Sequence, residues 1–169
     1  MNKENVLKKV IRLSVVAALY IALTFALSSL AYGNIQFRVA EILVLLCFFR
    51  KDYAYSMILG CAIVNLFSPL GLIDVFVGTF ATLLSVIGVM FSKKLWIASI
   101  FPVLFNGLIV GLELWLVLDL PFALSAIEVA IGEMVVMIFG VVVFKYLQKD
   151  KHFIELIDAN QNIKKANKL

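Results

Sequence analysis

The sequence predicts an all-α integral membrane protein, built as a bundle of six transmembrane helices with both termini in the cytoplasm. The chain of 169 residues is 63% hydrophobic and has a mean hydropathy of +1.05, whereas soluble domains are nearer half apolar. Three stretches carry no charged side chain, at residues 13–37, 53–73 and 95–112. Apolar runs of roughly 18 residues or more are typical of helices that cross a bilayer.

Basic residues set the predicted orientation. They lie in four groups, and between these groups the chain turns back through loops without Lys or Arg, at 30–37, 66–72 and 118–123. Cytoplasmic loops carry the excess of Lys and Arg, so this alternation predicts an even number of spans. Of the 15 Lys and Arg residues, Arg38 alone lies away from the predicted cytoplasmic side.

Each predicted span is an apolar stretch between two such loops. The spans are 10–30, 37–49, 53–68, 71–91, 95–118 and 122–147. The second and third are short for a bilayer of about 30 Å, so we expect them to tilt or to lie behind neighbouring helices. The first is longer than the apolar core of a secretory signal, so we expect it to be retained.

The predicted organisation is a single membrane domain with a tail. Residues 1–147 form the membrane domain, and residues 148–169 form a polar cytoplasmic tail. Within the tail, "FIELI" favours a short amphipathic helix on the inner surface.

Helical rise converts position in the chain into depth. We count about 1.5 Å per residue from the nearest cytoplasmic basic group toward the outer side of the membrane. On this count, polar side chains of five spans lie at one level, roughly 18–21 Å from the basic groups. These side chains are Arg38, Asn65, Thr79, Asn106 and Glu133. Asp74, Glu113 and Glu128 lie higher, at roughly 25–30 Å. The pattern predicts a polar site that faces outward.

The charges of this region do not balance. Its outer half holds one cation, Arg38, and five carboxylates, which are Glu41, Asp74, Glu113, Glu128 and Glu133. Arg38 and Glu41 stand at i and i+3 and can pair locally, which by itself fits a structural ion pair equally well. Up to four acids remain, so either several are protonated or a cationic ligand completes the site.

Two further spacings support a site. Asn106 and Glu113 are seven residues apart and therefore share one face of the fifth span. Pro69 and Gly71 predict a tight turn between the third and fourth spans, flanked by Asn65 and Asp74. The turn residues alone fit a structural role, and the flanking pair fits a ligand-binding role about equally.

The first span carries a stripe of small residues. Ser14, Ala18, Ala22 and Ala26 recur every four residues, a spacing that lets another helix approach closely. Packing inside the bundle and docking of an external partner both remain open from the sequence.

Several motifs of other protein classes are absent from the sequence. It has no GxxxxGK[ST] phosphate loop and no HExxH motif, and Cys47 and Cys61 lie in apolar runs, where Cys behaves as a small hydrophobe. We find no convincing nucleophile–base arrangement in the membrane part. We therefore expect neither an enzyme nor a metal or cofactor protein, and no nucleic-acid partner.

Four stretches carry a resemblance to a known family: "QFRVAEILVLL" (36–46), "NLFSPLGLIDVFVGTFATLL" (65–84), "PVLFNGLIVGLEL" (102–114) and "IGEMVV" (131–136). Together with the six spans and the small-residue stripe, they resemble the substrate-binding subunit (S component) of an energy-coupling-factor (ECF) transporter. Within that class the chain is similar to the QueT family over about residues 10–147.

The resemblance implies the capture of a queuosine precursor from outside the cell. The ligand would be a 7-deazaguanine such as preQ1, a flat molecule with an aminomethyl cation, which fits the excess of acids. Carboxylates can accept paired hydrogen bonds from its N–H edge, and Asn side chains can both donate and accept. The expected substrate-binding residues are Gln36, Arg38, Glu41, Asn65, Asp74, Asn106, Glu113 and Glu133.

The resemblance also implies partners. These are a transmembrane coupling protein (EcfT) and two cytoplasmic ATPases in a bacterial-type plasma membrane, with Ala18, Ala22 and Ala26 as the docking face. The alternative is a stand-alone proton-coupled secondary transporter that uses the excess acids as a proton relay. The charge-poor inner half of the bundle counts against a relay. A purely structural subunit would leave the five acids unexplained.

Overall fold

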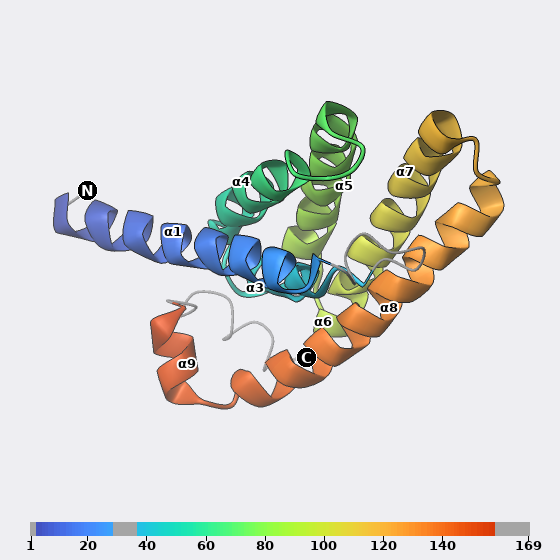
Figure 1. Cartoon of the computed structure of the whole chain (residues 1–169). Coiled ribbons are helices and arrows are strands. Elements are labelled where there is room, and N and C mark those ends of the chain that lie inside the picture. The colour runs from blue at the N-terminus through green and yellow to red at the C-terminus, as the bar shows by residue number, and fades with distance from the viewer. Residues whose placement is uncertain (1–2, 29–36, 158–169) are drawn as a thin grey trace.

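The computed structural model describes residues 3–28 and 37–157, and these residues form helices and turns without a strand (Figure 1). The helices follow one another in this order: α1 (Lys3–Ala26), the 3₁₀-helix η1 (Val39–Leu45), α3 (Leu46–Phe49), α4 (Tyr53–Asn65), α5 (Leu72–Phe91), α6 (Leu95–Ala98), α7 (Ile100–Leu118), α8 (Phe122–Leu147) and α9 (Lys151–Leu156).

Three helical segments in the described part are long and apolar enough to cross a membrane. They are Leu72–Phe91, Leu95–Leu118 and Phe122–Leu147, and each agrees with its predicted span to within one residue. Val39–Phe49 and Tyr53–Asn65 are shorter apolar helices. The chain is therefore a multi-pass helical membrane protein, while the count of six spans and the location of both termini stay predictions.

Two of the predicted spans are not regular α-helices along their whole length. The second, 37–49, begins as the 3₁₀-helix η1 and continues as α3 only from Leu46. The fifth, 95–118, is interrupted at Ser99 between α6 and α7. Proline explains this interruption, because Pro102 has no N–H to bond the carbonyl group of Ala98 and its ring crowds that carbonyl.

Helix ends also differ from the prediction. Helix α4 stops at Asn65 rather than at residue 68, because a residue before proline disfavours helical dihedrals and Pro69 follows Ser68. The predicted turn forms: the Gly71 N–H donates to the carbonyl oxygen of Ser68 at 3.0 Å. Gly71 has a φ of 62°, which favours glycine. Helix α1 begins seven residues earlier than the predicted first span, at Lys3, and ends at Ala26.

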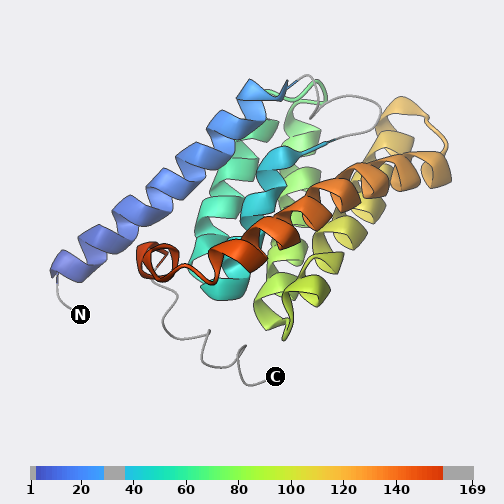
Figure 2. The ribbon, with the colours of Figure 1, turned by 90° about the horizontal axis from the view of Figure 1, so that it is seen from below.

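The η1–α3 segment is the centre of the molecule. It packs against α1, α4, α5 and α8. Figure 2 shows α8 crossing over the segment, which lies between α4 and α5. Since a 3₁₀-helix rises about 2 Å per residue, the seven residues of η1 span roughly 14 Å instead of about 10 Å. A short element thus reaches deep into the bundle from the end that carries Arg50.

Helices α7 and α8 form the closest helix pair. A Cβ atom at Gly111 would lie 2.6 Å from Cα of Ala126, and one at Gly107 would lie 2.9 Å from Cβ of Ala130. Glycine at both positions therefore allows the two backbones to touch. The sequence analysis missed this contact, although Gly107 and Gly111 form a GxxxG motif that could have revealed it.

The end of the bundle that carries the basic residues is closed by α9. The ring of Phe153 lies 6.5 Å from that of Phe49 and 6.0 Å from that of Phe144, measured between centroids. The hydroxyl group of Tyr53 donates to the carbonyl oxygen of Ile157 at 3.2 Å. The short helix expected in the tail is thus present and packs onto the hydrophobic core.

Candidate functional site

Seven of the eight predicted site residues are buried in the bundle and form what we call the polar cluster. The exposed fraction is 8% for Arg38, 7% for Asp74, 2% for Glu113, 1% for Asn65 and Glu133, and 0% for Glu41 and Asn106. Gln36, the eighth predicted residue, lies outside the described residues. The tertiary structure therefore brings together side chains from η1, α4, α5, α7 and α8.

Arg38 organises one half of the cluster. Its Nη2 atom lies 3.6 Å from Oε1 of Glu41, 3.5 Å from Oδ1 of Asn65 and 3.4 Å from Sγ of Cys61. The predicted local pair of Arg38 and Glu41 thus forms. Arg38 is the residue just before the 3₁₀-helix η1 and Glu41 lies in its first turn, so the pair spans the start of that helix.

Asn65 connects the end of α4 to the start of α5. Its Nδ2 atom donates to the backbone carbonyl oxygen of Asp74 at 3.0 Å. Gly78 leaves room for this contact, since a Cβ atom there would come within 2.4 Å of Asn65 Nδ2 and 2.9 Å of Asp74 Oδ1. The tight turn at Pro69 and Gly71 therefore serves to bring Asn65 and Asp74 together.

Three residues that the sequence analysis did not assign to the site complete this half, and one of them, Cys61, was expected to be only a small hydrophobe. The hydroxyl group of Tyr20 donates to Oε1 of Glu41 at 2.7 Å, and that of Thr82 lies 3.1 Å from Sγ of Cys61. Tyr20, Cys61 and Thr82 are each at most 1% exposed. A tyrosine in the middle of an apolar span was the available signal, because a buried tyrosine hydroxyl group generally needs a partner.

The other half of the cluster lies on α7 and α8. Here both carboxylate oxygens of Glu113 are buried and have no hydrogen-bond partner among the described residues. The amide of Asn106 lies beside the carboxyl group of Glu133, and Oε1 of Glu133 is buried as well. Glu133 interacts electrostatically with Glu41 and Arg38, and Glu113 does so with Asp74 and Arg38. These carboxylates therefore face the Arg38 half without a direct bond to it.

The cluster contains more acidic than basic side chains. Four carboxylates, those of Glu41, Asp74, Glu113 and Glu133, surround the single guanidinium group of Arg38. Buried carboxylate oxygens without a partner are costly, and a donor-rich or cationic group would satisfy them. No group of three or more His, Cys, Asp and Glu residues with a metal-binding arrangement occurs among the described residues.

Two predicted polar residues do not join the cluster fully. Glu128 is only partly buried, and Thr79 is partly buried with its hydroxyl oxygen shielded and unpaired among the described residues. Helical rise gives depth but not rotation about the helix axis, so depth alone placed these residues at the site.

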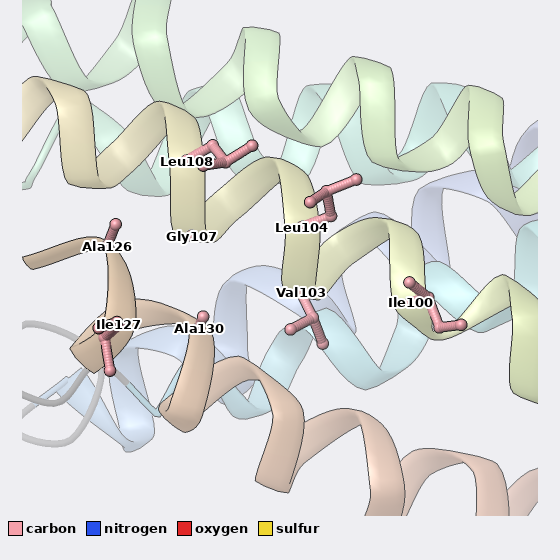
Figure 3. A pocket seen from close by; sticks show the side chains of 8 residues that line it. All are labelled: Ile100, Val103, Leu104, Gly107, Leu108, Ala126, Ile127 and Ala130. Carbon is pink, nitrogen blue, oxygen red and sulfur yellow. The ribbon is translucent and has the colours of Figure 1, made fainter. Parts of the chain in front are cut away.

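A cavity of about 320 Å³ lies between α7 and α8 (Figure 3). Its lining is apolar and consists of Ile100, Val103, Leu104, Gly107, Leu108, Ala126, Ile127 and Ala130. None of these residues belongs to the polar cluster. The chemistry for binding a polar molecule is therefore in the cluster, not in this cavity.

The small-residue stripe lies on the outer surface of α1. Ser14, Ala18, Ala22 and Ala26 are all exposed, whereas Ala17 and Tyr20 are buried on the opposite face. Of the two alternatives left open by the sequence, packing inside the bundle is not seen at this stripe within residues 3–28 and 37–157.

Fold and cluster together define a helical membrane protein that encloses a buried polar site rich in carboxyl groups. A sequence model of the QueT transporter family matches residues 10–149. The chain is 32% identical over 163 residues to the queuosine precursor transporter QueT of Lactococcus lactis subsp. cremoris (strain MG1363), a match that covers 87% of this chain and 96% of that relative. No solved structure matches the chain. The chain therefore belongs to the QueT transporter family, which confirms the resemblance to that family drawn from the sequence.

Proposed function

We propose that this protein is the substrate-binding subunit of an ECF-type importer in a bacterial plasma membrane and that it captures a queuosine precursor, a 7-deazaguanine such as preQ1. Membership of the QueT family supports the transport role, and the name of the Lactococcus lactis relative supports the substrate class. The polar cluster is the proposed binding site.

The observation that carries the proposal is the set of unpartnered carboxylate oxygens on Glu41, Glu113 and Glu133. A 7-deazaguanine offers a row of N–H donors, and preQ1 adds an ammonium group. One carboxylate can accept two hydrogen bonds from the N–H edge while a second binds the ammonium group. The amide of Asn106 supplies a donor and an acceptor for the carbonyl and ring nitrogen atoms. A site of this kind rejects analogues that leave its polar groups unpaired.

Binding and transport are separate steps in this proposal. The sequence has no phosphate loop, so ATP hydrolysis comes from partner subunits. The purified chain should bind preQ1 in calorimetry and, when reconstituted alone, show no ATP-dependent accumulation. Absence of preQ1 binding by the folded protein would refute the proposed substrate.

The excess of buried carboxylates supports a second candidate function, that of a proton-coupled secondary transporter. The two functions differ in what the isolated chain does in vesicles. A proton carrier would concentrate preQ1 in response to an imposed pH gradient without any other protein. A binding subunit would not, and uptake of that kind would replace our proposal.

The exposed stripe Ala18, Ala22 and Ala26 is the proposed docking face for the transmembrane coupling protein. Ala22→Leu should lower ATP-driven uptake by the full complex at least severalfold, because a larger side chain holds the partner helix away. Its preQ1 affinity should be unchanged. Ala123→Leu, at an exposed position on α8, is the matched control. Normal uptake with Ala22→Leu would mean that the stripe does not dock a partner.

A further inference from the structure

We propose that Tyr20 is a positioning residue that orients the carboxylate of Glu41 toward the ligand, an inference that rests on the proposed function. Tyr20 is on α1, which contributes no other side chain to the bonds of the polar cluster described above. Three observations lead to this assignment: the asymmetry of the Glu41 carboxylate, the fixed position of the Tyr20 ring, and the position of Tyr20 on α1.

The two carboxylate oxygens of Glu41 differ in their contacts. Oε1 accepts a hydrogen bond from the hydroxyl group of Tyr20 at 2.7 Å and also lies 3.6 Å from Nη2 of Arg38. Oε2 is buried and has no partner among the described residues. A carboxylate is planar, so two contacts to Oε1 fix the direction in which Oε2 points. The bond from Tyr20 therefore leaves one oxygen available for a ligand.

The Tyr20 side chain is itself held in place. It is 1% exposed, and its ring lies against Gly60 of α4, where a Cβ atom would come within 3.0 Å of Cδ1 of Tyr20. Thr24 donates from its hydroxyl group to the backbone carbonyl oxygen of Tyr20 at 3.0 Å. A phenylalanine would fit the same space. Removal of the hydroxyl group alone thus isolates its effect on Glu41.

The position of Tyr20 gives α1 two different faces. Residues two apart on a helix are separated by about 200° around its axis, so Tyr20 points away from Ala18 and Ala22. The exposed face carries the proposed docking stripe, and the buried face holds Glu41. The orientation of Glu41 therefore depends on where α1 lies.

The test is a double-mutant cycle with preQ1 as the probe, measured by calorimetry on the purified chain. Tyr20→Phe should lower the affinity roughly tenfold, the size expected when a hydrogen bond to a charged group is lost. In a Glu41→Met background the same substitution should change the affinity less than about twofold, because no carboxylate remains to be oriented.

Tyr53→Phe is the matched control, since Tyr53 is also fully buried and its hydroxyl group donates to the carbonyl oxygen of Ile157 rather than to Glu41. It should leave preQ1 affinity unchanged. Equal losses for Tyr20→Phe in both backgrounds, or no loss in either, would overturn the assignment and leave Tyr20 as a packing residue.

A measurement without ligand keeps the inference separate from the proposed function. The infrared carboxyl band of Glu41, identified by its loss in Glu41→Gln, should shift in Tyr20→Phe and stay in place in Tyr53→Phe. An unshifted band would refute the positioning role. A shifted band in a protein that does not bind preQ1 would refute the substrate proposal and leave the positioning role standing.

Discussion

The two halves of the polar cluster differ in how their polar groups are satisfied. Around Arg38, side chains of α1, η1, α4 and α5 contact one another directly, at distances of 2.7–3.6 Å. On α7 and α8, Asn106, Glu113 and Glu133 are equally buried, yet several of their polar atoms have no partner among the described residues.

This difference separates residues that stabilise the fold from residues that are available to bind a ligand. A buried polar atom without a partner costs about 1–3 kcal/mol, so a protein retains one where function requires it. The Arg38 half is bonded internally and supports the central η1–α3 segment. The α7–α8 half carries buried carboxyl oxygens without a partner among the described residues. We expect substitution of Arg38 in the first half to affect mainly stability, and substitutions in the second half to affect mainly binding.

The largest expected effect is the loss of Arg38. Arg38→Met should lower the free energy of unfolding by about 3–5 kcal/mol, because removal of one partner leaves the buried Glu41 carboxylate uncompensated. Equilibrium unfolding in mixed detergent micelles measures this change. Glu113→Gln is the control, and its unfolding free energy should stay the same or rise. Similar losses in both variants would remove the distinction between the halves.

The next largest effect is expected at Glu133, where binding should change strongly and stability only slightly. Glu133→Gln should weaken preQ1 binding roughly tenfold to a hundredfold, since a charge-assisted hydrogen bond to the ligand is lost. Its unfolding free energy should change by less than about 0.5 kcal/mol, because the glutamine keeps the shape of the side chain and can still pair with Asn106 beside it. Calorimetry and unfolding on the same preparation check both values. A destabilised variant with normal affinity would place Glu133 among the residues that stabilise the fold.

Glu41 lies where the two halves meet, and a pair of ligands can define its role. Glu41→Gln keeps the shape of the side chain and removes its charge. It should weaken the cationic preQ1 about tenfold and its neutral nitrile analogue preQ0 only about twofold. The comparison needs both affinities in wild type and variant. If the variant unfolds readily while binding both ligands normally, the Arg38–Glu41 pair is structural only.

The smallest effect is expected at Asp52, which forms ion pairs with Lys9 and Arg50 outside the polar cluster. Partial burial raises the pKa of Asp52, but hydrogen bonds from Lys9 and Arg50, with Asp52 Oδ2 at 3.0 Å and 2.9 Å, outweigh this and lower the pKa below its ordinary 3.8. Because the folded-state pKa is depressed, the stabilisation is full above the ordinary value and is lost as the pH falls through the lowered value.

Asp52→Asn should therefore cost about 0.2–1 kcal/mol near neutral pH and nothing at pH values below the lowered pKa. Unfolding of wild type and variant across that acidic range checks the direction. A loss at neutral pH as large as that of Arg38→Met would show that solvent does not weaken this pair.

Sequence patterns predicted the long helices well because length and apolar content determine them. Predictions for α5 and α8 agree with the structure to within one residue, and the turn between Asn65 and Asp74 follows from Pro69 and Gly71. The prediction was weaker where proline or packing changes a helix locally. Pro102 interrupts the fifth span, and η1 adopts a 3₁₀ conformation among four neighbouring elements.

For the site, the sequence indicated which charged residues are too costly to leave in an apolar environment. Arg38, Glu41, Glu113 and Glu133 were identifiable for that reason. Their partners were not, since Tyr20 and Cys61 are common residues in apolar helices and gain a role only from their neighbours. Tyr20 and Glu41 are 21 residues apart in the chain, and no helical periodicity relates them.

By itself the sequence determined a multi-pass helical membrane protein of the QueT family with an excess of acids near one level of the bundle. Only the tertiary structure decided which polar atoms are bonded and which stay without a partner. Depth along a helix follows from residue number, whereas rotation about its axis depends on contacts with other helices. Gly78 and Gly111 show why, because each matters only through the atoms of another helix or turn that approach it.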